Sequence, residues 1–373
     1  MVGCGTVAVE TLAAGKSGLF SDVDPLACLL TRAKASPVDP ESLKSTVEEI
    51  IRKWKPNARP GVSRSQAKRE VEDLEESTKF RAPPRVFHWF SPYVVVNLSR
   101  ILRGIDDAQE SRRKREALLA IFASVIRRVS RADPNTASGL EVTRVRKEEL
   151  AAGLKFDVTS ELRKRMEIVV KGYGDLIRLS KKARLVVAQA DAREWSKTCK
   201  MNRLTPDLVI TSPCYLSAIE YWRRHRLEYC WLGLVDPQDL AKVRRKFLGM
   251  GEEEPDTTNL SPYLARLYKR FVRSGFQKEA TNFARYFNDS SLWLEEVSEV
   301  IARTEGTAYV IVGANCTRGN VIDTPRGLHE MAARTGLKSG VLLRYLITNY
   351  HMQYPTKGNT RIREETVLKL VPN

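Results

Sequence analysis

The sequence has little histidine and no paired cysteines. Its 373 residues include four histidines and six cysteines. The cysteines are scattered, without CxxC spacing or histidines at metal-ligand spacing: Cys4, Cys28, Cys199, Cys214, Cys230 and Cys316. Zinc modules and disulfide-bonded domains depend on such spacing. The pattern therefore predicts reduced thiols, with no metal site and no disulfide framework.

Long apolar runs and a leader are missing as well. No apolar stretch approaches the roughly 20 residues that cross a bilayer. The amino terminus has no basic region followed by an apolar stretch. These absences predict a soluble, cytoplasmic chain, long enough for one large domain or two smaller ones.

Acidic residues are outnumbered by basic ones. The 62 lysines and arginines exceed the 45 aspartates and glutamates, which gives a formal net charge of +17 and a pI of about 9.7. This charge favours an acidic polymer as the partner, although ribosomal and membrane-surface partners fit it as well.

Two stretches of alternating strands and helices flank a helical middle. Residues 1–40 predict a glycine turn, a helix over about residues 6–14, a strand over 18–21 and a second helix. Residues 41–182 predict charged helices such as ESLKSTVEEIIRKW. In residues 183–373 we expect strands ending at Asp191 and Ser212, then the strands GTAYVIVGAN and TRIREETVLKLVP. The order predicts a doubly wound α/β sheet with a large insert between its second and third strands.

The turn GCGT at residues 3–6 is a candidate ligand site. Glycines let the backbone approach a ligand closely, and the helix that follows points its amino terminus at polar groups. Asp22 and Asp24 lie at the end of the next strand, where a carboxylate can accept both ribose hydroxyls of a nucleoside. A structural turn, and a plain helix cap by Asp22 or Asp24, are the alternatives.

Four motifs resemble, in their order, those of S-adenosylmethionine-dependent DNA methyltransferases. VGCGTVAVET resembles the cofactor motif, SDVDPLA the acidic ribose motif, QADAREW the third motif and TSPCY the catalytic motif. The resemblance covers the two end portions and not the insert. It implies a Rossmann-like class I methyltransferase sheet, S-adenosylmethionine as the cofactor and double-stranded DNA as the partner. It further implies a cofactor site with Gly3, Gly5 and Thr6 at the methionine part, Asp22 at the ribose, Asp24 as a second acidic candidate and Asp191 at the adenine amine.

The catalytic motif predicts a pocket for a flipped base. Such a base is held on its hydrogen-bonding edge and stacked on an aromatic ring. Tyr215 can supply the ring, while the Ser212 hydroxyl and the Pro213 carbonyl face the exocyclic amine. The motif resembles that of the amino-directed cytosine group, whose members have a second proline where this chain has Cys214.

Cys214 leaves two reactions open. Methylation of cytosine at carbon 5 needs a thiolate that adds to carbon 6, and enzymes of that kind carry a Pro-Cys dipeptide. Glu220 can then protonate ring nitrogen 3, with Arg223 or Arg224 near the carbonyl of the base. Methylation of the exocyclic amine of cytosine, or less readily of adenine, needs no nucleophile, and Cys214 would then be a small apolar residue. The sequence favours carbon 5, although the other motifs of carbon-5 enzymes are missing.

The insert is predicted to hold DNA. Arg112, Arg113 and Arg115 are candidate phosphate contacts, with a solvated helix face as the ordinary alternative. The aromatic run at residues 87–90 is a candidate stacking cluster or a small core. RNA remains open as the polymer, because charge does not distinguish it from DNA. A catalytically silent DNA-binding subunit of a modification system is the rival interpretation.

The strand that should lead into the glycine turn is missing, because Met1 directly precedes it. An unpaired position at the centre of a parallel sheet is costly. We therefore expect a second polypeptide to supply this strand, the true start to lie upstream, or the terminal strand TVLKLV to be displaced into the gap.

Overall fold

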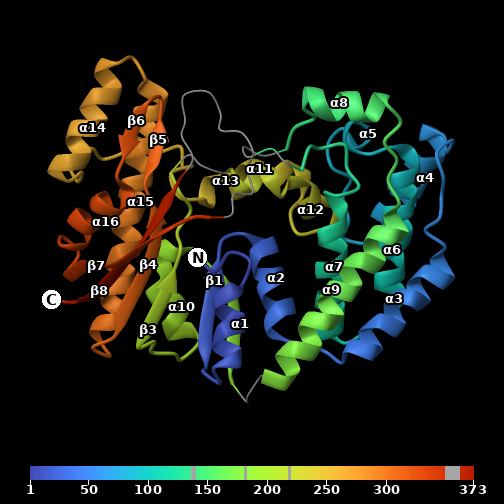
Figure 1. The fold of residues 1–373 in the computed structure, drawn as a ribbon, viewed down its shortest axis with the longest axis horizontal. Helices are drawn as coiled ribbons and strands as arrows, with labels where there is room; N and C mark the ends of the chain where they lie inside the picture. Colours follow the sequence, from blue (N-terminus) through green and yellow to red (C-terminus); the bar gives the residue numbers. More distant parts are fainter. Residues whose placement is uncertain (135, 137–139, 180–182, 217–219, 349–361) are drawn as a thin grey trace.

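The computed structural model has a mixed α/β architecture, which confirms the predicted class (Figure 1). It describes residues 1–373 except 135, 137–139, 180–182, 217–219 and 349–361. The described strands form three small sheets. The first joins β1 (Gly18–Asp22) and β2 (Leu185–Gln189), and the third is a hairpin of β5 (Asn315–Thr317) and β6 (Asn320–Ile322). The second contains, in this order, β3 (Leu208–Thr211), β4 (Thr307–Gly313), β8 (Glu364–Pro372) and β7 (Leu337–Leu346).

Parallel pairing of β1 with β2 joins the part of the chain before the insert to the part after it. β1 runs parallel to β2, and β3 runs parallel to β4, whereas β8 is antiparallel to both β4 and β7. Alternate residues of β4 and β8 are buried, as the period of a strand requires. They pack against the long helix α15 (Gln277–Ala302), whose Phe287 and Trp293 are almost fully buried.

Seven helices between β1 and β2 form the predicted insert. They are α3 (Pro40–Trp54), α4 (Arg64–Ser77), α5 (Val86–Trp89), α6 (Pro92–Asp107), α7 (Arg112–Ile126), α8 (Arg144–Ala151) and α9 (Val158–Leu179). Side chains of Asp39, Ser63, Ser111 and Thr143 accept backbone N–H groups at the starts of α3, α4, α7 and α8. Local capping therefore helps to set where these helices begin.

The core of the insert includes residues from outside it. α2 (Pro25–Ala35) contributes Leu26 and Leu29, and α12 (Arg226–Trp231) contributes Trp231. The ring of Trp231 is fully buried, and the rings of Phe80, Phe90 and Phe122 lie around it at centroid distances of 4.6, 5.8 and 6.3 Å. The division into residues 1–40, 41–182 and 183–373 remains a prediction, but the middle part shares one core with both ends.

The remaining helices are all shorter than α15. Most of them lie around the strands and in the upper part of Figure 1. They are α1 (Thr6–Ala13), η1 (Ala192–Glu194), α10 (Trp195–Met201), α11 (Tyr221–Arg224), η2 (Pro237–Asp239), α13 (Leu240–Lys246), α14 (Pro262–Arg273) and α16 (Thr324–Ala332). Within the described ranges, no helix is long and apolar enough to cross a membrane.

β1 and β3 each have one edge that pairs with no strand in the described part of the chain. The first two residues lie between these edges, where Figure 1 places the amino terminus. The Val2 amide donates to the Ser21 carbonyl at 3.0 Å, and the Thr211 hydroxyl donates to the Met1 carbonyl at 3.4 Å. The expected displacement of TVLKLV into this gap is wrong, because these residues form β8 and pair with β4 and β7. A strand supplied by a second polypeptide or an upstream segment remains a prediction, and both edges that it would join are present.

Parts of the predicted elements lie outside the described residues. These are positions 180–182 at the end of the predicted insert, 360–361 at the start of the predicted last strand, and 218–219 just after the catalytic motif. Elsewhere the predicted strand and helix boundaries agree with the structure within one or two residues in the first forty positions and at β2, β3 and β4.

Candidate functional site

The glycine turn has the geometry of a close approach. Gly3 and Gly5 have φ angles of 55° and 84°, which side chains rarely adopt. A Cβ atom on Gly5 would lie 2.8 Å from the Thr31 hydroxyl and 2.9 Å from the Thr31 Cα, whereas one on Gly3 would meet nothing within 4 Å. No side chain caps α1, which begins at Thr6. The turn therefore packs closely against α2 at Gly5 and leaves space in front of Gly3.

Asp22 connects this turn to the end of β1. One carboxylate oxygen accepts the Gly3 amide and the other accepts the Asp24 amide, both at 3.0 Å. An ionised carboxylate has about four acceptor sites, so Asp22 can accept further hydrogen bonds. The structure thus brings together two of the predicted cofactor residues, Gly3 and Asp22.

Asp24 has a different environment, with only 3 % of its surface exposed. It accepts the amides of Leu26 and Ala27 at 2.8 and 3.3 Å, as an N-cap of α2. Its second oxygen lies 2.8 Å from His225 Nδ1. Asp24 is therefore a helix cap, which was the ordinary alternative, and its contact with a cofactor remains a prediction.

A pocket lies beyond the end of β3, beside the catalytic motif. It is lined by Cys214, Tyr215, Leu216, Glu220, Tyr221, Trp222, residues 247–250, Asn282 and Tyr286. The Tyr286 hydroxyl donates to the Cys214 carbonyl at 3.0 Å, and the Tyr215 hydroxyl donates to the Glu365 carboxylate on β8. Two polar side chains, Glu220 and Asn282, face an otherwise largely aromatic wall. The cavity volume of the pocket is only about 20 Å³, so a flat aromatic ligand could enter only after side chains of the wall move apart.

The predicted catalytic residues divide between the pocket and its approach. Cys214, Tyr215 and Glu220 line the pocket, whereas Ser212 is exposed and Pro213 is buried at the end of β3. Arg223 lies 3.5 Å from Glu220 and 3.6 Å from Glu141.

Other candidates lie apart from the pocket. Arg224 donates to the carbonyl of Thr136 at 3.2 Å. On α7, Arg112 pairs with Glu116 and Arg115 pairs with Asp106. The structure therefore groups Glu220 with Arg223 and separates the basic residues of α7 from them.

The Cys214 thiol lies in an environment that keeps it protonated. Burial raises the pKa of this thiol to about 12, and the carboxylates of Asp22 and Asp289 act in the same direction. The influence of Asp22 also shows that the end of β1 lies near the end of β3. A thiolate is the reactive form of cysteine, and this setting disfavours it.

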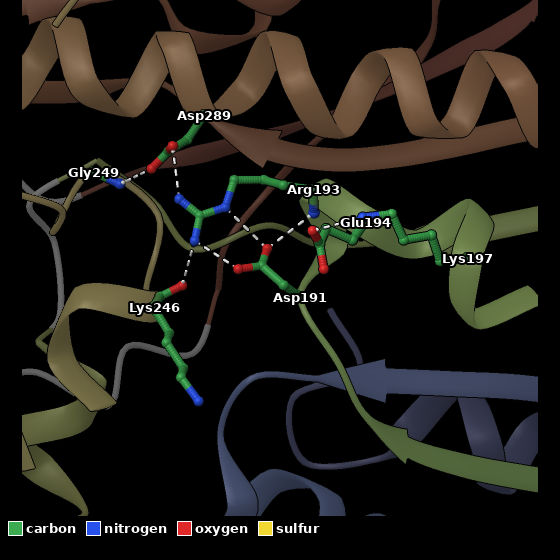
Figure 2. Close-up of polar contacts among 7 residues, drawn as sticks. All are labelled: Asp191, Arg193, Glu194, Lys197, Lys246, Gly249 and Asp289. Carbon is green, nitrogen blue, oxygen red and sulfur yellow. Dashed lines mark hydrogen bonds and ion pairs between the residues drawn. The ribbon is translucent and has the colours of Figure 1, made fainter. Parts of the chain in front are cut away.

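Asp191 belongs to an ionic network centred on Arg193, drawn in Figure 2. The guanidinium donates to both Asp191 oxygens, at 3.0 and 2.6 Å, to Asp289 on α15 at 2.8 Å, and to the Lys246 carbonyl at 3.2 Å. Asp289 also accepts the Gly249 amide at 2.7 Å. The hydrogen bonds that Arg193 donates to the Asp191 carboxylate raise the pKa of Arg193 above its ordinary value, so its charge is fixed.

This network connects three parts of the site. Asp191 follows β2, Asp289 lies on α15, and Gly249 lies in the loop that lines the pocket. Arg193 therefore links the third motif to the wall of the pocket, although sequence reasoning did not single it out.

Sequence reasoning also missed much of the pocket wall. Tyr221 and Trp222 follow the catalytic motif closely and are a readable aromatic signal. Asn282 and Tyr286 are four residues apart on α15, so they share one helix face. Nothing in the sequence indicates which face of α15 turns toward the pocket.

Comparisons with known proteins add no relative. The chain matches no protein-family model, no curated protein and no solved structure. Among the described residues, no group of three or more His, Cys, Asp or Glu side chains is placed to hold a metal ion. The function therefore has to be inferred from the turn, the pocket and the charges around them.

Proposed function

We propose that this chain transfers a methyl group from S-adenosylmethionine to the exocyclic amine of cytosine in double-stranded DNA. The proposal is carried by the adjacency of the glycine turn and the aromatic pocket, which are about 200 residues apart in the sequence. Hydrogen bonds of Val2 to Ser21 and of Thr211 to Met1 hold the ends of β1 and β3 on either side of the first residues. Ligands of open α/β sheets bind at the carboxyl ends of such strands.

The residues around the turn suit the cofactor. The uncapped amino terminus of α1 favours a negative group, which fits the carboxylate of the methionine part beside Gly3, Gly5 and Thr6. Asp22 keeps acceptor sites for ribose hydroxyls, and Asp191 is the candidate partner of the adenine amine. When bound, S-adenosylmethionine would supply an electrophilic methyl group. The protein would supply position and orientation.

The pocket suits the base. Tyr215, Tyr221 and Trp222 offer aromatic surfaces, and the Glu365 carboxylate fixes the orientation of the Tyr215 hydroxyl. The Ser212 hydroxyl and the Pro213 carbonyl would accept the N–H groups of the target amine. These hydrogen bonds would turn the nitrogen lone pair toward the methyl carbon. Transfer would form the N–C bond and break the bond between sulfur and methyl, and one N–H proton of the amine would then leave to solvent.

The environment of Cys214 favours the amine over carbon 5. Carbon-5 methylation requires a thiolate, but burial raises the pKa of this thiol to about 12. We predict that Cys214→Ser keeps most of the turnover, because a small side chain at this position only fills space. Loss of a covalent nucleophile costs on the order of 10⁶-fold in turnover, so the two outcomes differ widely.

Steady-state methyl transfer to DNA measures the turnover of Cys214→Ser. The matched control is Cys199→Ser, on α10. Trapping of a covalent adduct on DNA that contains 5-fluorocytosine would contradict the amine proposal and restore carbon 5.

The Rossmann-like sheet is part of the same proposal. A strand that pairs with the free edges of β1 and β3 would join the first two sheets into the order β2, β1, added strand, β3, β4, β8, β7. The turn at residues 3–6 would then follow that added strand directly, as in a dinucleotide-type site.

The decisive experiment is mass spectrometry of nucleosides from DNA incubated with the protein and S-adenosylmethionine. We expect amine-methylated deoxycytidine; carbon-5-methylated deoxycytidine or amine-methylated deoxyadenosine would change the assigned target. Parallel incubation with RNA tests the other polymer. Binding of labelled cofactor without any methylated nucleoside would refute the proposed reaction, and absence of both would favour a silent DNA-binding subunit.

A further inference from the structure

A basic hollow lies on the insert, away from the pocket. It is formed by the start of α4, the segment around α5 and one residue of the segment that follows α7. The lining residues are Arg64, Ala82, Pro83, Arg85, Val86, Phe87, His88 and Arg131. Three arginines, one histidine and one aromatic ring therefore face the same concave surface. The lining contains no acidic residue.

The arginines of this hollow lack acidic partners. Among the described residues, no carboxylate oxygen lies within 4.0 Å of the guanidinium nitrogens of Arg64, Arg85 or Arg131. Two of the three arginines predicted on α7 differ, because Arg112 lies beside Glu116, which it shares with Arg32, and Arg115 lies beside Asp106. Uncompensated like charges in a concave site focus a positive potential and attract an anion.

The same surplus of positive charge acts on His88. Burial lowers the pKa of this imidazole, and the charges of Arg85, Arg131, Lys147 and Arg226 lower it further. Four cationic side chains from different elements therefore surround His88. An anion in the hollow would relieve their mutual repulsion.

The hollow is also pre-organised. The Arg131 backbone amide donates to the Trp89 carbonyl at 2.7 Å, and its guanidinium donates to Phe87 O and Ser91 Oγ, both at 3.4 Å. Arg131 Nε is buried without a hydrogen-bond partner. The Arg64 guanidinium lies over the Phe87 ring, 5.9 Å from its centroid. Little ordering is therefore left to be completed when a ligand binds.

The position of the hollow connects it with the pocket. In Figure 1, α5 of the hollow lies in the upper part of the molecule, as do α11, which carries Tyr221 and Trp222 of the pocket, and α13, which precedes residues 247–250. A long polyanion that places one base at the pocket can extend along this part of the molecule to the insert.

We propose that this hollow binds a backbone phosphate of the DNA whose base enters the pocket. The identity of the polymer rests on the proposed function, whereas the choice of the hollow rests on its own charges. The phosphate would accept hydrogen bonds from the guanidinium groups, and the contact would position the duplex without reading its sequence.

The test uses the double variant Arg64→Gln with Arg85→Asn in the full chain. Both side chains are exposed, and asparagine tolerates the left-handed backbone at Arg85, where φ is 57°. Binding of a short fluorescent DNA duplex is measured by anisotropy over a series of potassium chloride concentrations. We expect weaker binding for all sequences and a salt slope lowered by about one unit for each lost phosphate contact.

Two matched variants separate this site from general charge. Arg52→Gln, on the exposed face of α3, should leave the slope unchanged. Arg112→Gln with Arg115→Gln removes the same charge from α7, where each arginine already has an acidic partner. A slope that falls in the α7 variant and not in the hollow variant would overturn the proposal.

Further arms decide the ligand. Loss of binding confined to an RNA duplex would overturn a DNA backbone site. Saturable binding of inorganic phosphate that depends on Arg64 and Arg85, with an unchanged salt slope for DNA in the double variant, would assign the hollow to free phosphate and overturn the proposal as well. Cofactor affinity of the hollow variant should equal that of the unaltered protein. DNA binding that depends on Arg64 and Arg85 without any methyl transfer would refute the proposed function alone, and methyl transfer with an unchanged slope would refute the hollow alone.

Discussion

At the scale of single residues, two thiols near the site have opposite environments. Cys4 is exposed in the glycine turn, where burial raises its pKa but the Thr6 hydroxyl and the Lys34 ammonium lower it more, so that the net shift is downward. Cys214 lies beyond β3, where burial raises the pKa to about 12. The two thiols therefore ionise in different pH ranges.

This difference predicts their alkylation by iodoacetamide. Only the thiolate reacts, so the Cys214 rate should rise about tenfold per pH unit from pH 8 to pH 11, whereas the Cys4 rate should level off at lower pH because its pKa is lowered. Peptide mass spectrometry after timed quenching measures both rates in one sample. The comparison uses the slope with pH, which the limited access to Cys214 does not alter. A Cys214 rate that levels off near neutral pH would contradict the protonated thiol.

Gly5 is the second residue with a specific requirement. We predict that Gly5→Ala lowers the free energy of unfolding by about 1–3 kcal/mol, because its φ of 84° strains a side chain and the new Cβ meets Thr31. Gly153→Ala is the control, since Gly153 has a φ of 96° and open space around it. Urea unfolding should show a larger loss for Gly5→Ala, and cofactor binding should fall for that variant only. Equal losses would mean that the contact with Thr31 is unimportant.

At the scale of elements, Arg193 holds η1, α15 and the pocket loop together. We predict that Arg193→Ala lowers the free energy of unfolding by about 1–3 kcal/mol, because Asp191 and Asp289 would both lose their partner in a mostly buried setting. Lys197→Ala is the control, since it breaks only the exposed pair with Glu194 shown in the same view (Figure 2). Thermal unfolding measures both, and similar midpoints for the two variants would contradict the role of Arg193.

Elements with local signals could be predicted from the sequence. The run Leu208-Val209-Ile210 and the apolar stretch at residues 307–313 predicted β3 and β4, and the alternative interpretation of Asp24 as a helix cap agrees with the start of α2. The pocket loop at residues 247–250 had no such signal, because its position depends on a hydrogen bond from Gly249 to Asp289, forty residues away.

Contacts between charged residues that are far apart in the sequence could not be predicted either. The run at residues 112–115 remains a predicted phosphate contact, but the pairing of Arg115 with Asp106 on α6 could not be predicted from it. The hollow around Arg85 and Arg131 could not be found, because these arginines are 46 positions apart and meet only through the packing of α5. Local periodicity predicts elements, whereas a site is made by contacts between them.

At the scale of the whole molecule, two sheets lie side by side, and the free edges of β1 and β3 lie between them. We predict that an apolar strand of about five residues fused ahead of Met1 raises the free energy of unfolding, because each strand hydrogen bond adds roughly 0.5–1.5 kcal/mol. The fusion should also reduce self-association, since Leu208 and Ile210 on β3 are 50 % and 41 % exposed.

The control is the same segment with a central proline, which cannot donate to a ladder. Urea unfolding and sedimentation velocity measure the two effects. The segment added as a separate peptide tests supply by a second polypeptide. Equal behaviour of the apolar and proline segments would show that the gap does not accept a strand.

The central place of Trp231 has a consequence for synthesis. Its ring fills a space bounded by Phe80, Phe90 and Phe122, all of which leave the ribosome more than a hundred residues earlier. The core of the insert therefore lacks the Trp231 ring at its centre until α12 has been synthesised. Residues 247–250, Asn282 and Tyr286 of the pocket follow α12 in the chain, so the core of the insert can be completed before the wall of the pocket has been synthesised.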